Sequence, residues 1–460
     1  MIRTIILISC FTLLFGCNSS DDSYEPNIPD TEEPNTPDDE VINFDPIDDN
    51  QLMDIVQQST FKYFWEYAET FSGAARERYV MNNPSDSQNV VATGGSGFGL
   101  MAIIVGIERN YVSKTEALVR LEVILNFFKN ADRFHGAWPH WIDGRTGKTI
   151  PFSSQDDGGD LVETALFAQG LLATREYFKN GSEKEKQIAN LADELWKSIE
   201  WNWYTNDQNK LVWHWSPNHG FDINLTIKGY NESLIAYVLA AASPEYSISK
   251  EVYTQGWASS GEIKNQNVLY DIPLLVKHGG NTSNVGSLFY SHYSFIGLNP
   301  TNLKDEFVNY WDVAKNHTLI NYQYALSNPK NYRHYGKYCW GLTASYTYQN
   351  GNLGYMAHSP ANDEGVISPT AAISSIVYTP KESLDAMQYF YHKKDILLGP
   401  AGFYDAFSPQ QNYWVANAYL AIDQGPMLLM IENHRTQLLW NLVMNANEVQ
   451  QGLTKLGFTY

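Results

Sequence analysis

Apolar residues recur at helical spacing from about Gln51 to the C-terminus, and this pattern constrains the fold of the chain more than any other feature. Between residues 118 and 128, for example, leucine and phenylalanine side chains fall at steps of three and four residues, which places them on one helix face. Short strands are predicted at 148–152 and 211–215. The pattern predicts about twelve helices. Nine of them cover 52–70, 97–109, 160–179, 229–241, 304–325, 369–377, 413–422, 425–433 and 436–446. The other three begin at Ser113, Ser182 and Thr379.

Three of these helices begin with a capping-box pattern, in which a hydroxyl residue is followed three positions later by Glu. The pairs are Ser113 with Glu116, Ser182 with Glu185, and Thr379 with Glu382. In the third case Pro380 occupies the first helical position, which proline tolerates well. The sequence therefore predicts the residues at which these three helices begin.

The predicted helices fall into two kinds. Segments such as 99–108, 163–173, 232–242 and 425–434 are apolar nearly all round, whereas 114–130 and its like are amphipathic and charged. A buried inner set that alternates with a half-exposed outer set is what a double ring of helices requires. We therefore predict an all-α (α/α)6 barrel with long aromatic loops at one end over residues 51–460, and two packed helical domains as the alternative.

The N-terminus has the pattern of a bacterial lipoprotein. Residues 1–17 form a short apolar run that ends in Leu-Phe-Gly-Cys, so we predict a signal peptide (1–17) and lipidation at Cys17. Residues 18–50 contain twelve Asp or Glu, five Pro and no Lys or Arg, which predicts a disordered tether. We therefore expect an outer-membrane lipoprotein that faces the periplasm or the cell surface. Cys10 would leave with the signal peptide, and Cys339 is predicted to be a buried, unpaired thiol.

The formal charge of −20 argues against nucleic-acid binding, which needs a basic surface. No zinc pattern, EF-hand, phosphate-binding loop or G-x-S-x-G motif is present, so we predict neither a metal nor a cofactor. The glycine-rich stretch 94–99 is interpreted instead as a place of tight packing or close approach to a substrate.

Acidic residues open two of the apolar helices. Asp160 and Glu163 follow a double glycine and share one helix face, and Glu232 opens the helix over 232–242. Each has an ordinary alternative role: Asp160 as an N-cap, and Glu163 and Glu232 as partners of the helix dipole. In a double ring, however, the starts of the inner helices converge at one end.

Carboxyl groups from different helices could then face each other across one cleft, the arrangement that glycoside hydrolysis needs. Our hypothesis is that Glu232 is the general acid and that Asp160 or Glu163 activates the attacking water molecule. Further acids are weaker candidates with structural roles as the alternative, namely Asp363, Glu364, Asp405 and Asp423.

Aromatic residues gather in the loops, where sugar rings could stack on them and where simple packing is the equally open alternative. The predicted substrate-binding residues are aromatic or polar and lie next to the acids or in these loops: Trp138, His140, Trp141, Asp156, Trp213, His214, Trp215, Tyr230, Tyr378 and Tyr404.

From about residue 51 to its end, the chain resembles the bacterial glycoamylase-like proteins, which include the endo-β-1,2-glucanases of glycoside hydrolase family 144. It departs from their pattern at Tyr346, where many members carry an acid. The resemblance is carried by GGSGFGLMAIIVGIERN (94–110), HGAWPHWIDGRTG (135–147), QDDGGDLVETALFAQGLL (155–172), VWHWSPNHGF (212–221), GYNESLIAY (229–237), SPTAAISSIVYTP (368–380), GFYDAFSP (402–409) and YLAIDQGPMLLMIENHRT (419–436).

The resemblance implies an (α/α)6 barrel, an inverting hydrolase without a cofactor, and catalytic acids at Asp160, Glu163 and Glu232. It makes an oligo- or polysaccharide, most specifically β-1,2-glucan, the expected substrate of a monomer that meets the membrane only through its lipid. Two alternatives stay open. One is a non-catalytic glycan-binding lipoprotein, and the other is a polysaccharide lyase or unsaturated-uronide hydrolase on the same barrel.

Overall fold

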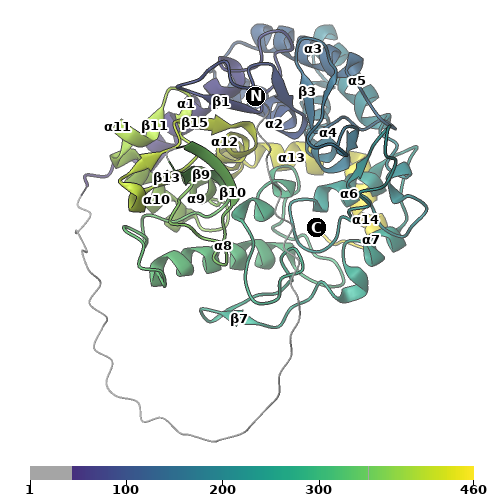
Figure 1. The fold of residues 1–460 in the computed structure, drawn as a ribbon. Helices are drawn as coiled ribbons and strands as arrows, with labels where there is room; N and C mark the ends of the chain where they lie inside the picture. Colours follow the sequence, from purple (N-terminus) through teal and green to yellow (C-terminus); the bar gives the residue numbers. More distant parts are fainter. Residues whose placement is uncertain (1–43, 351) are drawn as a thin grey trace, which may run out of the picture. The chain divides into compact units, whose positions relative to one another are not determined.

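Helices are the most frequent regular structure in the described part of the chain, and short strands lie in the loops between them (Figure 1). The computed structural model describes residues 44–350 and 352–460, and residues 45–460 form one unit. The helices are α1 (Asp49–Trp65), α2 (Thr93–Glu108), α3 (Lys114–Asn130), α4 (Leu161–Phe178), α5 (Glu183–Lys197), α6 (Leu234–Ala242), α7 (Lys250–Gln255), α8 (Tyr310–Ser327), α9 (Pro369–Ser374), α10 (Pro380–His392), α11 (Lys394–Leu397), α12 (Ala421–Thr436), α13 (Leu438–Met444) and α14 (Asn447–Leu456).

Five apolar helices form an inner row in which neighbours pack in the order α9, α12, α2, α4 and α6. Every residue of α6 and α9, and nearly every residue of α2, α4 and α12, is buried. Amphipathic helices cover this row: α10 packs on α9, α1 on α12, α3 and α5 on α2 and α4, and α14 on α6 (Figure 1). The predicted division into inner apolar and outer amphipathic helices is therefore present.

Glycines allow the inner helices α2 and α4 to approach closely. A Cβ atom on Gly97 would lie 2.3 Å from the carbonyl oxygen of Leu166, and one on Gly170 would lie 2.3 Å from the carbonyl oxygen of Gly97. Such distances leave no room for a side chain at either position, so the glycine-rich stretch 94–99 packs tightly against α4.

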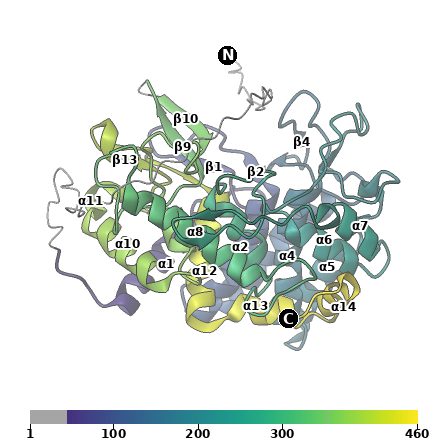
Figure 2. The same ribbon diagram turned by 90° about the horizontal axis from the view of Figure 1, so that it is seen from below.

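The strands hold the starts of the inner helices together. Strands β2, β5 and β15 lead directly into α2, α4 and α12, and pair with β3, β6 and β1. Several strands gather on one side of the helices in Figure 2, with α13 and α14 on the other. The strands are β1 (Arg78–Val80), β2 (Val90–Ala92), β3 (Trp141–Asp143), β4 (Thr149–Ile150), β5 (Gly159–Asp160), β6 (His214–Trp215), β7 (Val268–Leu269), β8 (Ile272–Pro273), β9 (Ala344–Gln349), β10 (Asn352–Ala357), β11 (Leu398–Gly399), β12 (Gly402–Phe403), β13 (Phe407–Ser408), β14 (Trp414–Val415) and β15 (Ala418–Leu420).

Two of the three predicted capping boxes are confirmed, at Ser113 before α3 and at Ser182 before α5. The third is wrong: the hydroxyl of Thr379 donates a hydrogen bond to the carbonyl oxygen of Ser375 instead of capping α10. Pro380 does occupy the first turn of α10, as predicted.

Some predicted boundaries are also wrong. Residues 413–422 hold β14 and β15 instead of a helix, and the helix predicted over 425–433 is part of the longer α12. The helix predicted from residue 304 begins at Tyr310, and the β9–β10 hairpin and α14 were not predicted. Helix α1 begins at Asp49, so the last residues of the predicted tether 18–50 belong to the folded unit.

The predicted signal peptide, the lipidation site Cys17 and most of the tether lie outside the described residues. Cys339 is buried and unpaired, as predicted. In the described part of the chain, no helix is long and apolar enough to cross a membrane.

Candidate active site

Asp160 caps α4 and anchors the centre of the site. Its Oδ1 atom accepts hydrogen bonds from the backbone N–H groups of Val162 and Glu163, both at 2.9 Å. Its Oδ2 atom accepts from Nδ1 of His140 at 2.8 Å and from the indole N–H of Trp213 at 3.3 Å. The N-cap interpretation of Asp160 is therefore confirmed, and both of its oxygens already have donors.

His140 supplies a positive charge beside these acids. Burial alone would lower the pKa of His140, but Glu163, Asp160 and Asp156 together raise it to about 9. The imidazole is therefore protonated at neutral pH and forms an ion pair with Asp160.

Glu163 lies in the first turn of α4, next to the start of α2. Its Oε2 atom accepts a hydrogen bond from the backbone N–H of Gly94 at 2.7 Å. A Cβ atom on Gly94 would lie only 2.8 Å from that oxygen, so the close approach depends on glycine at this position. Burial and the charge of Asp160 raise the pKa of Glu163, while His140 opposes the rise.

Glu232 lies in the turn before α6, and Ser294 holds this turn in place. The Ser294 hydroxyl donates to the carbonyl oxygen of Glu232 and accepts from the backbone N–H of Ile235 at 3.0 Å. Ser233 N–H donates to Asn231 Oδ1 at 2.9 Å, which closes the turn from the other end.

The Glu232 carboxyl group is surrounded by protein and still partly exposed to solvent. Burial raises its pKa to about 7, and the negative charges of Asp160 and Glu163 contribute to the rise. The charges of both acids at the start of α4 therefore act on Glu232. That the three carboxyl groups line one cleft stays a prediction. A carboxyl group with this pKa can donate a proton near neutral pH.

Asp156 and His214 extend the group of charges. Burial raises the pKa of Asp156 to about 7, with a further contribution from Asp160. Its Oδ1 atom lies 3.1 Å from Nε2 of His214, whose own pKa is lowered by burial. Both predicted residues therefore lie near Asp160.

Three of the predicted tryptophans are partly exposed near these groups. Trp213 binds Asp160 directly, Trp141 stands edge-on to the His140 ring with 5.6 Å between centroids, and Trp215 belongs to the strand that pairs with Gly159 and Asp160. Aromatic faces of this kind can stack on the C–H face of a sugar ring.

Other predicted substrate-binding residues are core residues in this structure. Trp138 is fully buried and donates its indole N–H to the carbonyl oxygen of Phe128 at 2.9 Å. Tyr230 and Tyr378 are also buried, and their hydroxyl groups bind Ser291. These three support the loops because their polar atoms already have partners inside the protein. Tyr404 packs on Tyr419, and no contact joins it to the three acids among the described residues.

Sequence reasoning missed Glu77 and Arg78. The two side chains form an ion pair at the start of β1, and the pKa of Glu77 is raised by burial while Arg78 and His140 oppose the rise. The Arg78 guanidinium lies 6.0 Å from the centre of the Trp141 ring. In the sequence the pair looks like an ordinary charged surface stretch, and only the fold places it beside His140.

Asp405 and Asp423, the weaker candidates, form a buried pair of carboxyl groups. They are hydrogen-bonded to each other, and burial raises the pKa of Asp405 to about 7 and that of Asp423 well above its usual value. Asp405 Oδ2 also accepts from the backbone N–H of Tyr346 at 2.7 Å. The pair shares a proton, because two neighbouring buried carboxylates cannot both be charged.

Asp363 accepts hydrogen bonds from the hydroxyl groups of Tyr324 and Tyr335, at 3.0 and 2.8 Å, and so ties two core tyrosines together. Its neighbour Glu364 accepts from Thr347 at 3.4 Å. Over the described residues, no group of three or more His, Cys, Asp or Glu could hold a metal ion.

Comparison with known proteins shows the family of this chain. Residues 224–447 match the family model described as "Glycoamylase: Putative glucoamylase". An endo-β-1,2-glucanase from Chitinophaga pinensis, solved with sophorotriose and glucose, is 51% identical, with a TM-score of 0.88 over 90% of this chain and 99% of that one. The chain belongs to the glycoamylase-like family.

Longer members of the glycoamylase-like family are also similar. An exo-β-1,2-glucooligosaccharide sophorohydrolase (non-reducing end) from Parabacteroides distasonis is 42% identical over 434 residues, which are 89% of this chain and 58% of that protein. A β-1,2-glucanase structure from the same organism is also 42% identical, with a TM-score of 0.83 over 90% of this chain and 60% of that one. This chain thus spans somewhat more than half the length of these relatives.

Proposed function

We propose that the protein is a glycoside hydrolase that cleaves β-1,2-glucan. The observation that carries the proposal is the start of α4, where Asp160 binds His140 and Glu163 accepts from the Gly94 N–H. Glu232 supports it from the turn before α6, because burial and the charges of Asp160 and Glu163 raise its pKa to about 7. The similarity to an endo-β-1,2-glucanase, a β-1,2-glucanase and an exo-β-1,2-glucooligosaccharide sophorohydrolase supports both the reaction class and the linkage.

In the proposed mechanism, Glu232 is the general acid. It gives its proton to the glycosidic oxygen as the bond from that oxygen to the anomeric carbon breaks. A water molecule forms the new bond to the anomeric carbon from the opposite face, and its proton passes to a carboxylate of the α4 pair. This route inverts the configuration.

Glu163 is the better candidate for accepting that proton, with Asp160 as the alternative. Both oxygens of Asp160 already accept hydrogen bonds, whereas Glu163 uses only Oε2, toward Gly94. The remaining oxygen of Glu163 has no hydrogen-bond partner within the described part of the chain, which leaves it available to a water molecule. Asp160 would then fix His140 and the start of α4.

The proposed substrate contacts come from residues around these acids. Trp141, Trp213 and Trp215 would stack on sugar rings, and His140, Asp156 and His214 would bind hydroxyl groups. The buried Trp138, Tyr230 and Tyr378 are not part of this set.

We also propose the finer features that the sequence predicts. The inner and outer helices would form an (α/α)6 barrel over residues 51–460, which acts as a monomer. Lipidation at Cys17, after removal of the signal peptide 1–17, would tether this unit to the outer membrane through residues 18–50.

The proposal is tested by incubating the purified protein with linear and cyclic β-1,2-glucans and with β-1,3-, β-1,4- and α-1,4-glucans. Thin-layer chromatography and a reducing-sugar assay follow the products. New reducing ends from β-1,2-glucan alone are expected, and proton NMR of the first product should show the inverted anomer. Cleavage of another linkage would overturn the assigned substrate.

Tight glucan binding without sugar release would instead favour a non-catalytic binding protein. Unsaturated products, detected by their ultraviolet absorbance, would favour a lyase.

A further inference from the structure

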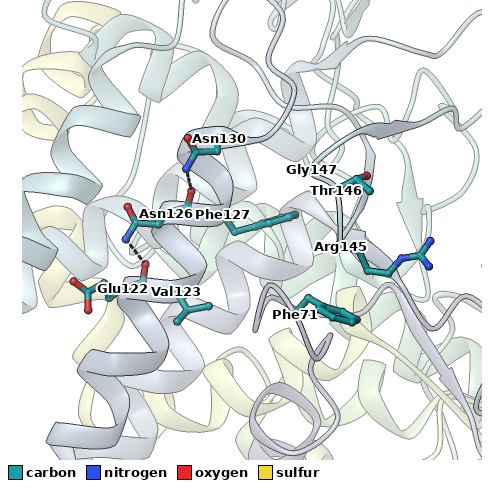
Figure 3. A pocket seen from close by; sticks show the side chains of 9 residues that line it. All are labelled: Phe71, Glu122, Val123, Asn126, Phe127, Asn130, Arg145, Thr146 and Gly147. Atoms are coloured by element: carbon teal, nitrogen blue, oxygen red, sulfur yellow. Dashed lines mark hydrogen bonds between the residues drawn. The ribbon is translucent and has the colours of Figure 1, made fainter.

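A surface groove lies on the outer helix α3, apart from the acids of the candidate active site (Figure 3). Its volume is about 470 Å³, within the range of about 300–1,000 Å³ typical of small-ligand sites. One wall is the α3 face with Val123, Asn126 and Phe127, and the other is formed by Phe71 and the turn at 145–147.

Phe71 is the most exposed large hydrophobic side chain among the described residues, at 67%. Its turn is held from beneath by the buried Glu69. The Oε2 atom of Glu69 accepts hydrogen bonds from the backbone N–H groups of Phe71 and Ser72, at 3.1 and 2.7 Å. The backbone that carries the exposed Phe71 ring is therefore fixed by a buried carboxylate, and covering the ring with a ligand would be favourable.

The opposite turn, between β3 and β4, is equally well fixed. Asp143 Oδ1 accepts from the backbone N–H groups of Arg145 and Thr146, at 3.0 and 3.1 Å. Gly144 packs directly on Glu69, because a Cβ atom there would lie 2.3 Å from Oε2 of Glu69. Asp143 therefore fixes one turn and Glu69 the other, and the two turns pack together at Gly144, so the groove is preorganised.

The charges at the groove are neutralised within the protein. Glu122 pairs with Lys184 at 2.5 Å, and Arg145 pairs with Asp143 at 3.0 Å, with its guanidinium extending away from α3 in Figure 3. No unpaired charge among these residues calls for a charged ligand, so the groove suits a neutral one.

Two asparagines supply polar groups on the α3 wall of the groove. Asn126 and Asn130 each donate through the side-chain NH₂ group to the α3 carbonyl four residues earlier, at 2.8 and 2.7 Å (Figure 3). Their Oδ1 atoms are left to accept hydrogen bonds, and the rings of Phe71 and Phe127 supply apolar faces. A neutral sugar matches these groups, because its hydroxyl groups can donate hydrogen bonds to the amide oxygens and the C–H face of its ring can stack on the aromatic rings.

We propose that this groove is a second glycan-binding site, which holds a stretch of neutral β-glucan while another part of the same polymer lies in the active site. The inference rests on the proposed function, since a polymeric substrate is what makes a second site useful. Binding at two points raises the effective concentration of the polymer at the acids without changing the chemical step.

The test compares Phe71→Ala with Val119→Ala, which removes another exposed apolar side chain (58% exposed) from α3 outside the groove. Both changes are made in wild-type protein and in the Glu232→Gln background, which allows binding to be measured without turnover. Migration through native gels that contain long linear β-1,2-glucan reports binding to the polymer, and initial rates report hydrolysis of polymer and of a short oligosaccharide.

With Phe71→Ala we expect retention by the polymer gel, and kcat/KM on the polymer, to fall about fivefold. Hydrolysis of the short oligosaccharide should not change, Val119→Ala should match the parent, and Phe71→Trp should keep the binding. Equal polymer binding by Phe71→Ala and Val119→Ala would overturn the second site and leave the proposed function intact.

The two proposals can fail separately. If the wild type hydrolyses no glucan but binds one in a manner that requires Phe71, the groove is supported and the proposed hydrolysis is not. If the wild type binds no neutral glucan in these gels, the groove proposal is overturned.

Discussion

The carboxylate of Asp160 and the imidazole of His140 form an ion pair, with Oδ2 and Nδ1 2.8 Å apart, at the start of an inner helix. The same carboxylate caps that helix, so His140 is held by the fold and not by a mobile side chain. The fixed positive charge of His140 lowers the pKa values of Glu163 and Asp156 and so opposes the rise that burial causes. The pKa of Glu232 is raised to about 7 by burial, with contributions from Asp160 and Glu163.

Replacing Glu232 by Gln tests the general acid. The amide cannot give a proton to the leaving oxygen, so we expect kcat to fall by roughly 100- to 10,000-fold, the range typical of general acid–base groups. The temperature of thermal unfolding should be nearly unchanged, because the Ser294 hydroxyl keeps its hydrogen bonds to the backbone of residues 232 and 235. Glu245→Gln, at an exposed position after α6, is the control. Activity of Glu232→Gln within a few-fold of the control would remove Glu232 from the mechanism.

Replacing His140 by Gln should shift the pH dependence of catalysis. The positive charge of His140 lowers the pKa values of Glu163 and Asp156, so its loss raises both. The acidic limb of the kcat/KM profile, which reports the group that must be ionised, should therefore move to higher pH. His434→Gln, at an exposed position in α12, should leave the profile in place. An unmoved limb with a lower plateau would mean that His140 binds substrate without tuning the acids.

Gly94→Ala tests the placement of Glu163. The new methyl group would lie 2.8 Å from Oε2 of Glu163 and push the carboxylate away from the Gly94 N–H. We expect kcat to fall about 10- to 100-fold, as for catalytic groups displaced by about 1 Å. Gly99→Ala in the same helix is the matched control, since its nearest neighbour would be a Phe64 ring atom at 3.3 Å. Equal activity of the two variants would show that the position of Glu163 is unimportant.

Ser294→Ala tests the support of the Glu232 turn. Its loss leaves the backbone groups of Glu232 and Ile235 without their shared partner. We expect the free energy of unfolding to fall by about 1–2 kcal/mol and kcat by about tenfold, with KM little changed. Urea unfolding and initial rates check this, with exposed Ser249→Ala as the control. A loss of stability with normal kcat would limit Ser294 to a structural role.

Asp405→Asn tests the proton shared with Asp423. Because the folded-state pKa of Asp405 is raised to about 7, the folded protein keeps a proton that the unfolded chain has already released. This makes stability fall as pH rises from about 4 to about 7. An amide at residue 405 needs no proton, so the variant should lose less stability between about pH 5 and pH 8, by on the order of 1–3 kcal/mol. Thermal unfolding at both pH values measures it, and parallel losses in the two proteins would contradict the shared proton.

The helices and the first candidates for catalysis follow from local patterns. Apolar periodicity and the capping boxes at Ser113 and Ser182 place several helices because these signals depend only on neighbours in sequence. The double glycine before Asp160 likewise marks the start of α4. The helix that apolar periodicity predicts over 413–422 is wrong, because the pairing of β15 with β1 overrides the local preference for a helix.

Side-chain surroundings required the tertiary structure. Trp138 and Trp141 are alike in sequence, yet one is buried against Phe128 and the other lies beside His140. Glu77 lies near His140 because its backbone N–H binds the carbonyl oxygen of Val90 in β2, and β2 pairs with β3, which follows His140.

The sequence by itself determined which segments become inner helices and that two of them begin with acids, because apolar periodicity and helix-start signals act within a few residues. The tertiary structure alone decided which charges meet. The pKa values of Glu232, His140 and Asp405 depend on burial and on partners far away in the chain, and those distances exist only once the helices have packed.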